Sequence, residues 1–266
     1  MIVLLGWRYN THMLDDIAIV LVEPSHPGNV GAVARAMKTM GLRALRLVNP
    51  AQFPHEEATR RAAGADDVLH HAALYSTLKE AVADCAFVYG TSVRAREVAW
   101  PLYSVREAAL RIQHQSELLG VVQSAVVFGR ERSGLSNHEL DLCDAQIMIP
   151  ANPEYGSLNL ASAVQIISYE LRMASLKTET VDDCTQAAST GAQKRQLPAS
   201  KEEREGHLAH LHEVLEALDF IKSKPSDLLQ RKIARLYNKA ELTVEEVQIL
   251  RGILTATQSM LRSPKQ

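Results

Sequence analysis

Cysteine and long apolar runs are both scarce in this 266-residue chain. Its cysteines, Cys85, Cys143 and Cys184, lie far apart and form no Cys-x-x-Cys pair, so we expect no disulfide framework and a cytoplasmic location. No stretch approaches the roughly 18 consecutive apolar residues of a membrane span. The opening MIVLLGW has no basic region before it and no small-residue cleavage site after it, so we expect no signal peptide and no membrane attachment.

An excess of charge of one sign is lacking too. The chain carries 29 basic and 31 acidic side chains, and its 46% hydrophobic content excludes disorder as the main state. Overall charge therefore does not indicate a nucleic-acid binder. A local excess does occur near the C-terminus, where Asp227 is the single acidic residue within a basic cluster: Lys222, Lys224, Arg231, Lys232, Arg235 and Lys239. This cluster either meets phosphates or is a solvated helix face.

Apolar runs alternate with helical patterns over the first two thirds of the chain. Five runs predict buried strands, at residues 17–22, 44–48, 86–90, 124–129 and 145–150. Helices are predicted between and after them, at residues 30–40, 77–84, 105–117, 136–142 and 158–176. This alternation predicts an α/β fold with a mostly parallel sheet, whose ligands would lie at the carboxyl ends of the strands.

The pattern divides the chain into four parts. Residues 1–12 show no periodicity and are interpreted as an N-terminal extension, with Met13 a possible natural start. Residues 13–176 form the α/β domain. Residues 177–200 are rich in Thr, Ser, Gln and Ala and are interpreted as a linker. Residues 201–266 place leucines at helical spacing and predict a small all-helical domain.

Three segments carry candidate chemistry. The first, PSHPGNVGAVARAMKTMG (residues 24–41), places a tight turn before a helix, whose free amides favour anions. It contains neither GxGxxG nor GxxxxGK[S/T], which disfavours an ordinary nucleotide-binding α/β enzyme. The second, VVFGRERSGLSNHEL (126–140), puts charges directly after a strand, or is simply a solvated loop. The third, IMIPANPEYGSLNLASAVQIISYEL (147–171), opens a long helix at Ser157, a natural N-cap.

In this order and spacing, the three segments resemble the motifs of the SPOUT methyltransferases, and RGIL (251–254) fits the subgroup that methylates tRNA ribose. The resemblance implies a C-terminal trefoil knot, although knots are rare among folds. It also implies S-adenosylmethionine as cofactor. The cofactor pocket carried over from the family comprises Thr91, Ser92, Val93, Gly129, Ile149, Gly156, Ser157 and Leu158. We expect a bulky side chain at Gly129 to block the cofactor and leave the fold intact.

The catalytic set carried over from the family is Asn29, Arg35, Glu131, Ser157 and Asn159. A sulfonium donor is already activated, so the enzyme has to align the ribose oxygen with the methyl group and stabilise the forming alkoxide, and we expect no metal. Arg35 can hold a neighbouring phosphate bidentately. Its part in proton removal stays open, because a free arginine remains protonated in proteins. Gly156 departs from the family pattern, in which a second small polar residue is expected.

The resemblance implies 2'-O-methylation of the ribose at position 32 (cytidine or uridine) in the anticodon loop of tRNA. Two alternatives are kept: a catalytically idle RNA-binding protein of the same fold, and an rRNA 2'-O-methyltransferase. We further expect a homodimer, because residues 158–176 carry an apolar stripe wide enough for core or interface. In the helical domain Arg231, Arg235 and Lys239 share one helix face and are predicted to bind RNA, with Tyr237 able to stack on a base.

Overall fold

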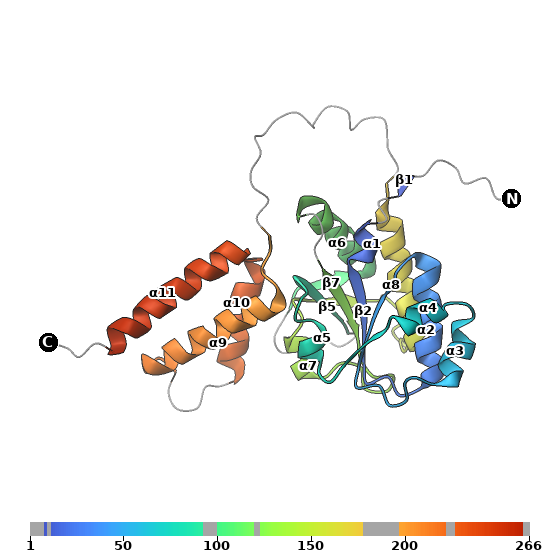
Figure 1. Cartoon of the computed structure of the whole chain (residues 1–266), viewed down its shortest axis with the longest axis horizontal. Coiled ribbons are helices and arrows are strands. Elements are labelled where there is room, and N and C mark those ends of the chain that lie inside the picture. Colours follow the sequence, from blue (N-terminus) through green and yellow to red (C-terminus); the bar gives the residue numbers. More distant parts are fainter. Residues whose placement is uncertain are drawn as a thin grey trace.

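The computed structural model describes residues 8–9, 12–92, 100–119, 123–177, 197–221 and 227–262 (Figure 1). Its centre is a seven-stranded sheet in the order β4-β3-β2-β7-β5-β8-β6. Every neighbouring pair in this sheet is parallel, as the alternation of strands and helices predicts. The strands are β2 (Ile17–Val22), β3 (Ala44–Val48), β4 (Ala73–Tyr75), β5 (Phe87–Thr91), β6 (Leu102–Ser104), β7 (Ser124–Phe128) and β8 (Ala145–Met148).

Four strands were not predicted from the sequence. β4 and β6 lie at the two edges of the sheet, where three residues of mixed exposure give no continuous apolar run. A separate antiparallel pair joins β1 (Arg8–Tyr9) to β9 (Leu176–Lys177). Part of the N-terminal extension is therefore paired with the end of the α/β region, a long-range contact that leaves no local signal.

Helices cover both faces of the main sheet. One face packs against α1 (His12–Asp15), α2 (Pro27–Met40), α3 (Glu56–Ala62), α4 (Asp66–His70), α6 (Val105–Leu119) and α8 (Leu160–Ser175). The other packs against α5 (Leu78–Ala81) and α7 (Asn137–Asp141). Along β2 the side chains alternate between the two cores, and all six residues are buried. That explains why the strand reads as a continuous apolar run.

Local signals set the ends of the helices that lead to the sheet edge. His26 caps α2, Pro27 occupies its first turn, and Gly41 ends it at φ 87°. The N-cap expected at Ser157 is wrong. Helix α8 begins at Leu160, and Asn159 Oδ1 accepts a hydrogen bond of 2.9 Å from the Ala161 amide. An asparagine at this position caps as well as a serine, and the helix starts where the buried residues begin.

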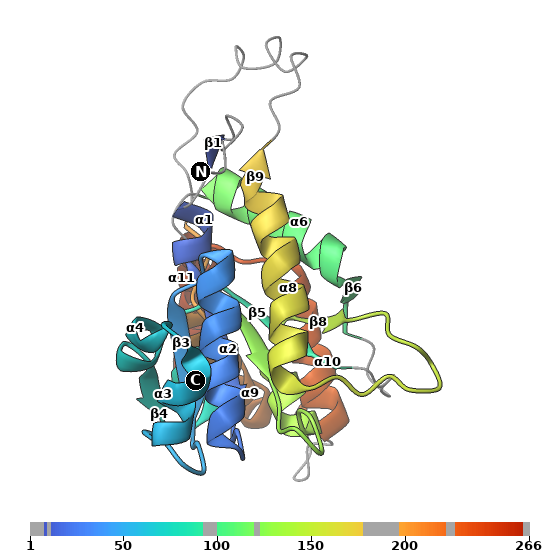
Figure 2. The ribbon, with the colours of Figure 1, turned by 90° about the vertical axis from the view of Figure 1, so that its right-hand side faces the viewer.

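The apolar stripe of α8 belongs to the core of a single chain. Leu160, Val164, Ile167 and Leu171 are all at most 7% exposed, and α8 packs beside α2 and α6 (Figure 2). A different face of α8 leaves apolar side chains in solvent, at Ile166, Tyr169 and Met173. Of the two uses considered for the stripe, core packing is the one that the fold makes.

The C-terminal helical domain consists of α9 (Lys201–Ala217), α10 (Asp227–Lys239) and α11 (Val244–Arg262). It contacts the α/β region at the amino-terminal edge of the sheet. The Lys201 amide donates to the Cys85 carbonyl (2.8 Å) and the Glu202 amide to the Ala83 carbonyl (3.0 Å), just before β5. None of the described helices is long and apolar enough to cross a membrane.

Candidate functional site

Three loops converge at the carboxyl-terminal edge of the sheet, and they are the three segments singled out in the sequence. Glu131, after β7, accepts hydrogen bonds from Ser25 Oγ (2.9 Å) and Asn29 Nδ2 (2.9 Å). Asn29 Oδ1 in turn accepts a bond of 3.2 Å from Asn159 Nδ2, at the start of α8. One continuous hydrogen-bond chain therefore joins the loops after β2, β7 and β8, and it contains three of the five predicted catalytic residues.

The electrostatics of Glu131 follow from these contacts. Partial burial alone would raise the pKa of its carboxyl group, but the hydrogen bonds from Asn29 and from Ser25 outweigh burial and hold the pKa below the ordinary range. Glu131 is consequently ionised at neutral pH. An ionised carboxylate only accepts hydrogen bonds, so it fixes the Asn29 amide with Nδ2 towards itself and Oδ1 towards Asn159.

Arg130 anchors the loop that carries Glu131. Its guanidinium contacts Glu23 at the end of β2 (2.7 Å from Nε) and both carboxylate oxygens of Glu139 (3.0 Å each). Glu139 also accepts from the Ser136 amide (2.7 Å) as part of the capping box of α7. Sequence reasoning missed Glu23 and Glu139 as partners. The Ser-x-x-Glu spacing was the signal for the cap, but no local pattern indicates the ion pairs.

Arg35 and Ser157 lie outside the hydrogen-bond chain. Arg35 is exposed on α2, and no hydrogen bond or ion pair joins it to another described residue. Arg35 follows Asn29 by six residues, which on an α-helix places the two residues about 9 Å apart along the axis and about 120° apart around it. Ser157 is exposed in the loop before α8. The structure thus unites Asn29, Glu131 and Asn159 but leaves these two free to meet other groups.

The predicted cofactor residues lie at the same edge, on β5, β7, β8 and the loop before α8. Thr91 Oγ1 donates to the Val127 carbonyl (3.0 Å) and the Ser92 amide donates to the Ile147 carbonyl (3.1 Å), which holds the ends of β5, β7 and β8 together. Val93 lies outside the described residues. Ile149 is half-buried, Gly156 is half-buried, and Leu158 is 38% exposed. Apolar and uncharged polar groups of this kind fit a nucleoside cofactor.

Gly129 has a different structural role from the one expected. A Cβ at this position would lie 2.1 Å from the carbonyl carbon of Gly134 and 2.2 Å from the Leu135 nitrogen. The loop doubles back here, with Gly134 at φ 68° and an isolated bridge from Arg130 to Gly134. A valine at Gly129 would displace backbone, so the expectation that such a variant leaves the fold intact is wrong.

The predicted RNA-binding face of α10 is turned partly towards the α/β region. Arg231 forms an ion pair of 2.7 Å with Asp141 on α7, and Arg235 is half-buried. Lys239 is exposed. Tyr237, expected to stack on a base, packs edge-on against His207 with ring centroids 4.7 Å apart. Lys222 and Lys224 lie outside the described residues.

The histidines of α9 also serve packing. His207 is 1% exposed, and burial lowers its pKa. His210 contacts Gln258 (3.2 Å) and His212 contacts Glu216 (3.2 Å). Within the described ranges no group of three histidine, cysteine or acidic residues is arranged to hold a metal ion.

Comparison with known proteins decides the family. The model of the SpoU rRNA methylase family matches residues 16–169. The chain belongs to this family. A second model, the C-terminal domain of the tRNA methyltransferase TrmJ, matches residues 202–266. These matches confirm the resemblance inferred from the motifs. They also confirm the α/β fold with a helical C-terminal domain. Membership of the family implies the trefoil knot.

Relatives of known name extend over nearly the whole chain. The tRNA (cytidine/uridine/adenosine-2'-O-)-methyltransferase TrmJ of Pseudomonas aeruginosa is 44% identical over 94% of this chain and 96% of its own. The tRNA (cytidine/uridine-2'-O-)-methyltransferase TrmJ of Pectobacterium atrosepticum is 46% identical over 92% and 98%. The crystal structure of TrmJ from Z. mobilis superposes with a TM-score of 0.76, at 35% identity over 91% of this chain and 98% of that one.

Proposed function

We propose that this SpoU-family protein is a tRNA 2'-O-methyltransferase that uses S-adenosylmethionine and acts on the cytidine or uridine at position 32 of the anticodon loop. The names of the relatives support the tRNA substrate and the 2'-oxygen as acceptor. The observation that carries the proposal is the hydrogen-bond chain from Glu131 through Asn29 to Asn159, because it uses an ionised carboxylate to orient two amide side chains beside the loops proposed to hold the cofactor.

S-adenosylmethionine, when bound, supplies a methyl group on a positively charged sulfur. The protein then has to orient the ribose hydroxyl and stabilise the charge that develops on its oxygen. Asn29 and Asn159 provide amides of fixed orientation, since Glu131 and the first turn of α8 each satisfy one end. Ser157 is exposed in the loop just before Asn159 and can donate to the nucleotide. The cofactor contacts are proposed for Thr91, Ser92, Val93, Gly129, Ile149, Gly156, Ser157 and Leu158.

Arg35 is proposed to hold the phosphate next to the acceptor ribose. Its guanidinium is exposed and forms no hydrogen bond or ion pair with another described residue, so none of these residues competes with a phosphate for it. A planar fork of donors suits a phosphate group. Its distance along α2 from Asn29 leaves open whether it serves its own subunit or a partner.

Assembly and division of labour complete the proposal. We propose a cytoplasmic homodimer, supported by the apolar side chains that α8 leaves exposed at Ile166, Tyr169 and Met173. Residues 13–176 would carry the chemistry and residues 201–266 would contribute to tRNA binding, with 177–200 as linker and 1–12 as extension. Arg231, Arg235 and Lys239 remain the proposed RNA contacts of the helical domain.

The direct test is an assay with full-length protein, S-adenosylmethionine and tRNA transcripts that differ at one atom. We expect methyl incorporation into unmodified tRNA, mapped by mass spectrometry to the ribose of nucleotide 32, and none into the same tRNA with a 2'-deoxyribose at that nucleotide. Incorporation elsewhere in tRNA would reject position 32. Methylation of rRNA alone would favour the rRNA enzyme, and RNA binding without methylation would favour the idle protein.

A subunit-mixing experiment tests the dimer and the placement of Arg35 together. Arg35→Ala and Asn159→Ala are each expected to be inactive. If Arg35 serves the partner subunit, mixing the two variants regenerates one intact site per heterodimer and restores part of the activity. If it serves its own subunit, the mixture stays inactive. A monomer by light scattering at full activity would reject the dimer.

A further inference from the structure

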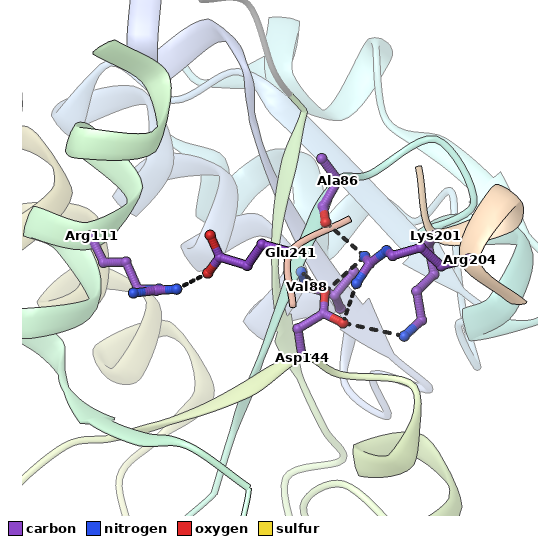
Figure 3. Close-up of polar contacts among 7 residues, drawn as sticks. All are labelled: Ala86, Val88, Arg111, Asp144, Lys201, Arg204 and Glu241. Atoms are coloured by element: carbon purple, nitrogen blue, oxygen red, sulfur yellow. Dashed lines mark hydrogen bonds and ion pairs between the residues drawn. The ribbon is translucent and has the colours of Figure 1, made fainter. Parts of the chain in front are cut away.

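The contact between the helical domain and the sheet contains a buried ionic cluster (Figure 3). Asp144, just before β8, accepts two hydrogen bonds from Arg204 (2.8 and 3.0 Å) and one from the Val88 amide (2.9 Å). Lys201 lies 3.4 Å from the same carboxylate. Arg204 also donates to the Ala86 carbonyl at 2.6 Å. This cluster fixes α9 against the amino-terminal ends of β5 and β8, opposite the proposed catalytic edge.

A cavity of about 130 Å³ lies beside this cluster, between the two parts of the chain. Its wall includes side chains from β5, α6 and the start of α9, together with the end of α10 and the residues after it. Trp100 and Tyr103 form an aromatic part of the wall, and the guanidinium of Arg111 lies 5.5 Å from the Tyr103 ring centroid. The volume admits a small anion or a few water molecules.

Cations exceed carboxylates on the wall. Four basic side chains line the cavity, Arg111, Arg204, Arg235 and Lys239, against two acidic ones, Asp144 and Glu241. Arg111 is paired with Glu241, and Arg204 with Asp144 (Figure 3). Arg235 and Lys239 have no carboxylate partner among the described residues. Lys201 adds a further positive charge at the edge of the cluster.

The wall also carries polar groups that the protein does not satisfy. Arg235 Nε and Asn238 Oδ1 are buried and have no hydrogen-bond partner within the described part of the chain. Nearly all buried polar atoms in proteins have a hydrogen-bond partner, so these two atoms indicate an occupant of the space. Arg235 Nε can donate directly to an anion, whereas Asn238 Oδ1 is an acceptor and requires a donor such as water or a protonated phosphate oxygen. The excess positive charge selects an anion rather than a neutral or cationic group.

We infer that this cavity between the sheet and α10 is a binding site for a phosphate group, held by Arg235 and Lys239. The arginine presents a fork of donors and the lysine a mobile point charge, which together match a tetrahedral anion. The phosphate can come from a free phosphoanion or from an RNA backbone. Because the wall belongs to both parts of the chain, occupancy would strengthen their contact.

The inference deepens the RNA-binding role proposed above for Arg235 and Lys239, but it does not depend on methyl transfer. Lys239→Gln is the principal variant, since Lys239 is exposed and its loss leaves packing unchanged. Arg235→Gln is the second. Lys232→Gln is the matched control, because Lys232 is exposed on the same helix and absent from the cavity wall.

The first arm titrates the full-length protein with inorganic phosphate and with pyrophosphate at constant ionic strength, by calorimetry and thermal unfolding. We expect saturable binding to wild type and to Lys232→Gln. In Lys239→Gln and Arg235→Gln the dissociation constant should rise about tenfold, the loss of one charge-assisted hydrogen bond. This outcome identifies a free phosphoanion as a ligand.

The second arm measures the affinity for a short single-stranded RNA and for unmodified tRNA over a salt series. If the phosphate belongs to RNA, Lys239→Gln and Arg235→Gln lower the slope of log K against log salt by about 0.7 to 0.9 per lost contact, and Lys232→Gln lowers it less. Equal effects of all three variants in this arm, with no saturable phosphate binding in the first, would overturn the inference. Failure of methylation would not, since neither arm uses it.

Discussion

Asp144 and Glu131 are both carboxylates at the ends of strands in one sheet, yet they lie in different surroundings. At the amino-terminal edge Asp144 is 11% exposed and meets two cations and a backbone amide. At the carboxyl-terminal edge Glu131 is half-buried and meets a hydroxyl, an amide side chain and a backbone amide, but no cation from the described part of the chain. One edge is closed by charge pairing, whereas the other leaves Asn159 exposed next to its partners.

The two edges therefore contribute differently: the amino-terminal edge to stability and the carboxyl-terminal edge to the proposed function. A buried ion pair that is fully hydrogen-bonded fixes one element against another, and removal of one partner leaves an uncompensated charge. At the solvent-facing edge the bond between Asn29 and Asn159 joins two neutral amides, and such a bond costs less to rearrange, so an incoming nucleotide can exchange it. We therefore expect substitutions at Asp144 to act on folding and substitutions near Glu131 to act on catalysis.

The largest effect on stability is expected for Asp144→Ala. Lys201 and Arg204 are only 4% and 5% exposed, and both would remain buried without a counter-charge. We expect a loss of about 3 to 5 kcal/mol in the free energy of unfolding, measured by urea denaturation. Asp141→Ala, which removes the partly exposed pair with Arg231, is the control and should cost at most about 1 kcal/mol. Equal losses in the free energy of unfolding of the two variants would contradict the proposed difference between the two edges.

Glu131→Gln is expected to reduce kcat while leaving stability nearly unchanged. A glutamine has a single acceptor oxygen, so it cannot hold both Ser25 and Asn29, and the Asn29 amide loses its fixed orientation. By analogy with the loss of one positioned donor, kcat should fall about 10²-fold. Unfolding curves that match wild type, beside the activity assay, separate this outcome from misfolding. A variant with full kcat would remove Glu131 from the site.

The pH dependence of stability gives a third test. Burial alone would raise the pKa of Asp144, but Lys201 and Arg204 outweigh it and hold the pKa below the ordinary range. A lowered pKa stabilises the fold fully at pH values well above the pKa of the unfolded chain, about 3.9, and this contribution is lost progressively as the pH falls from there through the lower pKa of the folded state. The stability gap between wild type and Asp144→Asn should therefore be constant near pH 6 and narrow as the pH falls below about 4. A constant gap would contradict the ion pairing.

The smallest effect is expected at Gly156. A Cβ added at Gly156 would lie 3.2 Å from its nearest neighbour, the Asn152 carbonyl oxygen, so a small side chain requires only a slight shift of that oxygen. Gly156→Ser, which introduces the residue type expected from the family pattern, should bind S-adenosylmethionine within about twofold of wild type. Gly129→Ser is the opposing control, because its Cβ would meet backbone at 2.1 Å. Loss of cofactor binding in Gly156→Ser would mean that the pocket needs the glycine itself.

The sequence predicted the parts of the fold whose signals are local. Strands β2 and β3 were predicted with the bounds that they have, because each is buried on both faces and reads as an apolar run. The short edge strands β4 and β6 were missed, since pairing on one side only needs no such run. The helical spacing of leucines predicted the C-terminal domain but not its docking, which depends on Asp144 and Ala86 far away in the chain.

The candidate site divides in the same way. The motifs identified Asn29, Glu131 and Asn159 individually as candidate residues. The sequence by itself determined their residue types and the fact that each follows a strand. Only the tertiary structure decided that they form one hydrogen-bond chain while Arg35 stands apart, and that Arg231 pairs with Asp141. The physical reason is that residue type and local periodicity can be read along the chain, whereas contacts between residues far apart in sequence depend on how the strands are ordered in the sheet.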